Sequence, residues 1–119
     1  MPADARAEAG ARAETLAAAF LVARGLVILE RNFRCRRGEI DIIARDGETL
    51  VFAEVRLRTR RDFGGAAASI GARKRARLTA TALYYLGRRP AAPPCRFDAI
   101  LLDSLDDGRI EWLKDIIGA

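Results

Sequence analysis

The chain has 119 residues, of which half are apolar and 31% are charged, and its formal net charge is +5. This length suits a single domain, and the apolar fraction excludes a disordered chain. No apolar run approaches the roughly 20 residues of a membrane span, and the N-terminus lacks the pattern of a signal peptide. We therefore expect one cytoplasmic domain over residues 1–119, with residues 1–9 as a frayed N-terminal helix or tail.

The expected elements alternate between helices and strands. Apolar residues at helical or alternating spacing predict, in chain order, a helix over 4–24, a strand with a polar middle over 26–35, strands over 38–45 and 48–57, a helix over 70–86, and strands over 96–103 and 110–113. Gly25 would end the first helix and Pro90 the second. The order α-β-β-β-α-β-β predicts an α/β sandwich around a mixed sheet.

The strands over 38–45 and 48–57 are joined by Asp46-Gly47, a strong hairpin signal. A two-residue turn there would place Glu39 opposite Glu54 and Asp41 diagonal to Glu54, because side chains alternate between faces. One face is then wholly apolar and must pack on a helix: Ile40, Ile42, Ala44, Val51, Ala53 and Val55. The other face is acidic at the end far from the turn.

Like charges that face each other across a sheet are destabilising, so this acidic end needs a cation. Arg56 on the same face is one candidate, and a divalent ion held by Asp41 and Glu54 is another. A solvated strand end neutralised by Arg56 and nearby arginines is the simpler alternative. Because the chain has no histidine and only two distant cysteines, any metal must be held mainly by oxygen, which favours Mg²⁺ or Mn²⁺.

The positive charge is concentrated in the middle of the chain. Residues 63–97 hold seven basic and no acidic residues, whereas residues 98–119 have a net charge of −4. Such a segment is typical of a surface that binds a polyanion, although a solvated helix face would give the same pattern. It lacks the wide apolar face of a membrane-binding helix, so we expect no membrane contact.

The hairpin motif resembles a known family. Its strings GEIDIIARDG (38–47) and LVFAEVR (50–56), with NFRCR (32–36) upstream and RFD (96–98) downstream, resemble the YraN-type family of bacterial proteins over residues 10–113. That family is similar to the PD-(D/E)XK nuclease superfamily, most closely to archaeal Holliday-junction resolvases. The resemblance implies a restriction-endonuclease-like three-layer sandwich, with a central mixed β-sheet flanked by helices, and a Mg²⁺- or Mn²⁺-dependent site for phosphodiester hydrolysis.

The resemblance also implies roles for particular residues. Asp41 matches the metal-binding aspartate, Glu54 the acidic residue of the (D/E)-x-K motif, and Glu14 the helical glutamate of the resolvase-like branch. The backbone carbonyl of Val55 would be a further metal ligand. These positions predict a metal site made of oxygen atoms from one helix and two strands.

One position departs from the superfamily pattern, which has lysine where this chain has Arg56. Arginine can stabilise developing charge but stays protonated, so it cannot act as a base. Lys74, at the edge of the apolar stripe of the second helix, is the alternative source of a catalytic lysine.

The remaining candidates surround this site. Flanking phosphates would be bound by Arg58, Arg60, Arg61, Arg73, Arg75 and Arg77. Glu39 and Asp98 are candidates for supporting positions, and Asp98 alternatively serves as the partner of an arginine. Because the sequence offers no evident aromatic stacking platform, we expect duplex or structured DNA rather than a single strand. The resemblance to resolvases further suggests a homodimer.

Three functions therefore remain open after the sequence is considered. The first is a metal-dependent endonuclease that cuts structured or duplex DNA. The second is a nuclease-fold protein that binds nucleic acid without cutting it, an alternative that Arg56 keeps open. The third is a scaffold whose basic helix contacts an acidic protein, which gives no reason for the hairpin carboxylates.

Overall fold

Five strands form one mixed sheet in the order β1-β2-β3-β4-β5, in which only β3 and β4 are parallel. The computed structural model describes residues 2–57, 71–87, 93–106 and 109–117, with side chains from Ala7 onward. The elements are α1 (Pro2–Ala23), β1 (Val27–Cys35), β2 (Gly38–Asp46), β3 (Thr49–Leu57), α3 (Ala72–Leu86), β4 (Cys95–Leu102) and β5 (Ile110–Leu113). The predicted order of elements and the α/β class are confirmed.

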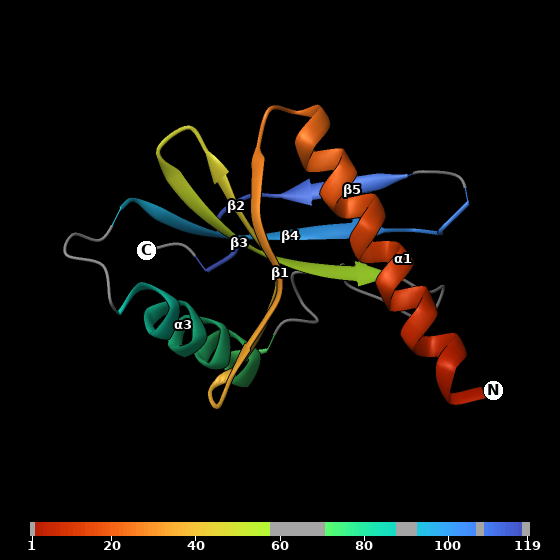
Figure 1. Cartoon of the computed structure of the whole chain (residues 1–119), viewed down its shortest axis with the longest axis horizontal. Coiled ribbons are helices and arrows are strands. Elements are labelled where there is room, and N and C mark those ends of the chain that lie inside the picture. Colours follow the sequence, from red (N-terminus) through yellow and green to blue (C-terminus); the bar gives the residue numbers. More distant parts are fainter. Residues whose placement is uncertain (1, 58–70, 88–92, 107–108, 118–119) are drawn as a thin grey trace.

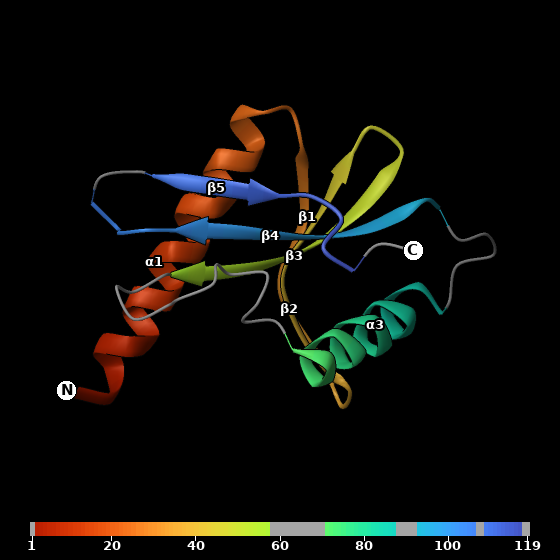
Figure 2. The ribbon, with the colours of Figure 1, turned by 180° about the vertical axis from the view of Figure 1, so that it is seen from behind.

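The two helices lie on opposite faces of the sheet, so the fold has three layers (Figures 1 and 2). Helix α1 buries Ala13, Ala17 and Leu21 against the sheet. Small alanines let the helix lie close to the sheet. Neither described helix combines the length and the apolar character needed to cross a bilayer.

The core on the face of α1 contains Ile42, Ala44, Val51, Ala53, Ile100 and Leu102. The core on the face of α3 is more aromatic. Phe52 stacks on Phe97 with ring centroids 5.4 Å apart and meets Tyr85 of α3 edge-on at 6.0 Å. Leu78 and Ala82 complete the contact, so α3 is held by rings from β3 and β4.

The predicted register of the β2–β3 hairpin is wrong by two residues. The structure pairs Asp46 with Thr49 and Arg45 with Leu50, so Gly47 and Glu48 form the loop. Gly47 has a φ of +61°, a backbone conformation that glycine adopts without strain. A shift of two residues preserves the faces but changes the partners, and Glu39 no longer faces Glu54. Arg34 of β1 lies opposite Glu39 instead.

The predicted face of Ile40 is also wrong. Ile42 packs against α1 as expected, but Ile40 lies in the core beneath α3. Strict alternation would place both side chains on one face. The alternation is interrupted at Asp41, where the β2–β3 ladder has already ended at the Ile42–Ala53 pair. The acidic end of the hairpin is therefore a place where two strands part.

The start of β2 lies directly against α3. Gly38 has a φ of +148°, and a Cβ atom at this position would lie 3.0 Å from Thr81 Oγ1. Glycine is thus required for two reasons, backbone conformation and close approach. Because the Thr81 hydroxyl is fully buried and donates to the carbonyl of Arg77, it has little room to move.

Asp98 holds the C-terminal part of the chain together. Its fully buried carboxylate accepts hydrogen bonds from Arg96 Nε, from Trp112 Nε1 at 2.9 Å and from the Asp115 N–H at 2.9 Å. The alternative role of Asp98 as the partner of an arginine is therefore the observed one. A buried charge with this many donors stabilises the fold only while all partners remain.

We expect Asp98→Asn to lower the free energy of unfolding by about 2–4 kcal/mol, because the side-chain amide places an N–H group among hydrogen-bond donors and Arg96 keeps only its ion pair with Asp46. Denaturant unfolding followed by circular dichroism measures this loss. Asp106→Asn is the matched control, because the Asp106 side chain is 93% exposed and its ion pair with Arg12 is long, at 4.0 Å. Equal stability of the two variants would contradict the structural role of Asp98.

Candidate active site

The site is organised by the point at which β2 and β3 part. The last pair of the ladder is Ile42–Ala53, so the next positions along the two strands are Asp41 and Glu54. Here the Val55 N–H donates to Asp41 Oδ2 at 2.8 Å, and a side chain takes the place of a backbone acceptor. Figure 1 shows the start of β2 beside α3, while the end of β3 continues toward α1. The Asp41 carboxylate fills the gap between the strands.

Glu54 is only 5% exposed, and its surroundings favour its neutral form. Burial raises the pKa of the Glu54 carboxyl from 4.5 to about 8, supported by the hydrogen bond and the negative charge of the neighbouring Asp41. Lys74 acts in the opposite direction. Burial and the neighbouring Asp41 thus outweigh Lys74 in their effect on the pKa of Glu54.

Lys74 reaches this pair from α3. Its Nζ lies 2.9 Å from Glu54 Oε2, and its side chain is 34% exposed. The approach is close but poorly aligned, so within the described residues Glu54 Oε2 is a buried oxygen without a hydrogen-bond partner. Of the two basic candidates, Lys74 is therefore the one in contact with the acidic motif.

Arg56 follows Glu54 by two positions on β3 and lies opposite Leu101, on the face of α3. Its Nε is buried, and no group in the described part of the chain accepts a hydrogen bond from it. A buried guanidinium donor without an acceptor is costly. Arg56 lies beside the carboxyl pair with hydrogen-bonding capacity that the described residues leave unused.

Glu14 is held at the opposite side of the site by β1. Its Oε1 accepts hydrogen bonds from Arg31 Nε at 3.0 Å and from Asn32 Nδ2 at 2.9 Å. Asn32 has a φ of +55°, which interrupts the regular strand and turns its amide toward the helix. Glu14 is 6% exposed and is fixed in place rather than free to move.

One cavity of about 590 Å³ contains several of the predicted residues. Glu14, Glu39, Asp41 and Val55 all contribute to its wall. Glu39 is also bound by Arg34 at 2.9 Å, an exposed ion pair. Across the described segments, no three acidic or cysteine side chains converge tightly enough to enclose a metal ion. The structure therefore brings Asp41, Glu54 and Lys74 together, with Glu14 and Glu39 at the rim.

The other predicted residues are distributed differently. Asp98 pairs with Ala53, which places it on the face opposite Glu54, away from the carboxyl pair. Arg73 and Arg77 are exposed on α3, and Arg75 is partly buried there. The predicted phosphate ligands Arg58, Arg60 and Arg61 lie outside the described residues.

Sequence reasoning missed the residues that fix the site. The partners of Glu14, which are Arg31 and Asn32, come from the polar middle of β1. That interruption of an otherwise apolar strand was the available signal. The Val55 N–H that binds Asp41 could not be recognised, because every residue except proline has this donor.

The comparisons with known proteins agree on one family. The model of "Uncharacterised protein family UPF0102" matches residues 13–102, most of the chain. The protein belongs to this family. Similar UPF0102 proteins include one from Methylobacillus flagellatus, 53% identical over 92% of this chain and 96% of its own length, and one from Janthinobacterium sp., 50% identical over 99% and 94%. The YraN-type resemblance is confirmed at the level of the family.

The raised pKa of Glu54 predicts a pH-dependent stability. Between pH 4.5 and about 8 the folded protein binds a proton at Glu54 that the unfolded chain has released. The free energy of unfolding should therefore fall through this group as pH rises across that window. Glu54→Gln removes the titration, so the variant should become more stable relative to the wild type between pH 5 and pH 8.5.

Denaturant unfolding in the presence of a chelator measures this difference at each pH. Glu48→Gln is the matched control, because Glu48 is exposed in the hairpin loop. Parallel stability curves for the wild type and Glu54→Gln would show that Glu54 titrates normally.

Proposed function

We propose that this protein is a metal-dependent endonuclease that hydrolyses phosphodiester bonds in structured or duplex DNA. The observation that carries the proposal is the pairing of Asp41 and Glu54 where β2 and β3 part, with Lys74 2.9 Å from Glu54. The similarity of the hairpin motif to the PD-(D/E)XK superfamily supports it. The three-layer fold, with its mixed sheet between two helices, agrees with that expectation.

The carboxyl pair fits a divalent cation. Glu54 Oε2 is buried without a hydrogen-bond partner among the described residues, and burial together with the neighbouring Asp41 raises the pKa of Glu54 to about 8, a shift that a bound cation would oppose. Asp41 and Glu54 would hold the ion with the Val55 carbonyl, and Glu14 lies across the same cavity as Asp41. A Mg²⁺ or Mn²⁺ ion held by these residues would supply Lewis acidity for phosphodiester hydrolysis.

The residues of the chain would orient the metal ligands, stabilise negative charge and bind the DNA backbone. The Asp41–Val55 hydrogen bond keeps the aspartate oriented. Lys74 would take the role of the motif lysine, since its ammonium contacts Glu54 and can stabilise negative charge that develops on the phosphate. Arg56 contributes fixed positive charge. Arg73 and Arg77, exposed on the same helix as Lys74, bind the phosphates that flank the scissile bond.

A specific observation also favours the alternative of binding without cutting. Lys74 partly neutralises Glu54 already, and no three-ligand cluster is present within the described segments. Arg56, which cannot act as a base, stands where the superfamily has lysine. In this alternative Asp41 and Glu54 serve only to part the strands.

We expect the wild type to cleave branched or duplex DNA with Mg²⁺ or Mn²⁺. Asp41→Asn and Glu54→Gln should each lower the rate by about 100-fold or more, because each removes an anionic metal ligand. Glu48→Gln, in the exposed hairpin loop, is the control and should cleave normally. Cleavage retained in both site variants would refute the proposed site, and binding without cleavage by the wild type would establish the alternative.

The two basic candidates can be separated by matched substitutions. Lys74→Met should lower the cleavage rate by about 100- to 1,000-fold, the loss typical of a single electrostatic donor. Arg56→Lys keeps the charge on β3 and should change the rate by less than about tenfold. Single-turnover rates measured with saturating enzyme separate these effects from weaker binding. Equal losses in the two variants would contradict the assignment of the lysine role to Lys74.

A further inference from the structure

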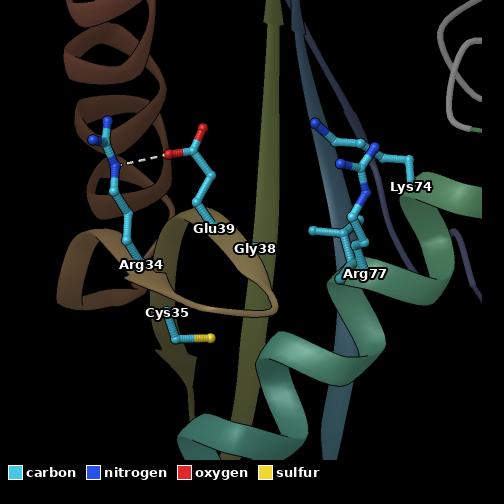
Figure 3. A pocket seen from close by; sticks show the side chains of 7 residues that line it. Arg34, Cys35, Gly38, Glu39, Lys74 and Arg77 are labelled. Atoms are coloured by element: carbon cyan, nitrogen blue, oxygen red, sulfur yellow. Dashed lines mark ion pairs between the residues drawn. The ribbon is translucent and has the colours of Figure 1, made fainter.

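Three cavities that share wall residues lie in sequence from Asp41 to a basic groove. The first cavity holds Asp41 and shares Arg34 and Glu39 with a second cavity of about 350 Å³. The second runs between the β1–β2 turn and α3, with Arg34 and Glu39 on one side and Lys74 and Arg77 on the other (Figure 3). It shares Arg34 and Arg77 with the third. The three cavities thus adjoin one another from Asp41 past Lys74 to Arg77.

The third cavity, of about 700 Å³, is lined by a set of residues that we call the arginine groove: Arg34, Arg36, Arg37, Arg77 and Tyr84. Arg36 and Arg37 are exposed at the β1–β2 turn, and Arg77 is exposed on α3. In the described part of the chain, none of these three arginines is engaged in an ion pair. No acidic side chain lines this groove within the same residues. Its charge is therefore available to an anionic ligand.

Tyr84 supplies an aromatic surface to this groove. Its side chain belongs to a residue that is 57% exposed, and its ring lies 6.3 Å from that of Phe33 at an angle of 38°. Phe33 is in turn fixed edge-on against Tyr85 at 5.2 Å. The Tyr84 ring thus contacts Phe33 on one side and lines the groove on another. An exposed ring beside arginines is the combination that binds unpaired bases and their phosphates.

The spacing along α3 sets the size of the ligand. Lys74 and Tyr84 are ten residues apart on one helix, about 15 Å at 1.5 Å per residue. Nucleotides along one strand of B-form DNA are about 3.4 Å apart, so this distance spans roughly four of them. Within a duplex, base faces are covered by their stacked neighbours, and Tyr84 could stack only on an unpaired base.

We propose that the arginine groove and Tyr84 bind the unpaired strand at a junction between duplex and single-stranded DNA. The unpaired base stacks on Tyr84, its phosphates contact Arg36, Arg37 and Arg77, and the duplex leads to the carboxyl pair. This inference rests on the proposed function for the orientation of the DNA. The sequence-based expectation found no evident aromatic stacking platform, and the exposed Tyr84 ring is the candidate that the structure adds.

The test measures binding in the presence of a chelator, so that cleavage plays no part. Fluorescence anisotropy compares a blunt duplex with duplexes that carry overhangs of one, two, four and eight nucleotides. The wild type should bind the overhang duplexes about tenfold more tightly than the blunt one, with the preference complete by about four nucleotides. A 2-aminopurine base in the overhang should lose fluorescence when it stacks.

Matched variants assign the preference to residues. Tyr84→Ala should abolish both the preference for overhangs and the quenching of 2-aminopurine, whereas Tyr84→Phe should keep both. Leu83→Ala is the control at a neighbouring residue that is 64% exposed, and it should change neither the preference nor the quenching. Replacing Arg36 and Arg37 by alanine should reduce the slope of log affinity against log salt by about 1.4, because each phosphate contact on a single strand contributes about 0.7. Arg45→Ala, an exposed arginine of β2 outside this groove, should leave the slope unchanged.

The outcomes distinguish this inference from the proposed function. Equal affinity for blunt and overhang duplexes, or a preference that survives in Tyr84→Ala, overturns the inference even when the wild type cleaves DNA. A preference that depends on Tyr84 supports it even when no cleavage is observed, in which case only the nuclease proposal fails.

Discussion

The hydrogen bond from the Val55 N–H to Asp41 is the interaction on which the site depends. A backbone donor in the middle of a sheet must find an acceptor, and normally the neighbouring strand provides it. Here a side chain provides it, so β2 and β3 can separate without leaving this donor unsatisfied. The separation frees the start of β2 to approach α3 and leaves Asp41 beside Glu54. The use of a side-chain acceptor in place of a backbone carbonyl thus determines both the shape of the hairpin and the position of its acids.

The electrostatics of the site follow from this geometry. Two carboxyls at neighbouring positions, one of them 5% exposed, cannot both be charged without compensation. Lys74 offers part of it from a helix, and burial beside Asp41 still raises the pKa of Glu54. Glu14 differs, because Arg31 and Asn32 donate hydrogen bonds to it. The site therefore contains one acid pair that Lys74 compensates in part and one acid that is locally balanced.

The sequence could predict the elements and much of the site, because both depend on local patterns. Alternating apolar residues identified the hairpin, and its acids identified Asp41 and Glu54. The register was not predictable in the same way, since a loop of Gly47-Glu48 competes with one of Asp46-Gly47 and both preserve the faces. The face of Ile40 failed for a different reason. Alternation assumes a continuous ladder, and the point where a ladder ends depends on a long-range hydrogen bond.

The grouping of the basic residues also depends on long-range contacts that the sequence does not show. A run of arginines predicts a charged surface, but which arginines share a groove depends on how the β1–β2 turn meets α3. Arg36 and Arg37 are distant in sequence from the segment with the highest charge, and only the fold brings them to Arg77. The role of Tyr84 was likewise not predictable, because the sequence pattern of α3 cannot show that Phe33 of β1 contacts its ring.

The close contact between Gly38 and Thr81 has a consequence for the chemistry two turns away. Lys74 belongs to a different element from Glu54, so the separation of their charges is set by tertiary packing and not by the covalent chain. A methyl group added at Gly38 would lie 3.0 Å from Thr81 Oγ1, so the contact between β2 and α3 would have to widen by a few tenths of an ångström. The absence of a side chain at Gly38 therefore sets how closely the helix that carries Lys74 approaches the strand that carries Asp41. The distance between a cation and its acidic partner then depends on a residue that bonds to neither.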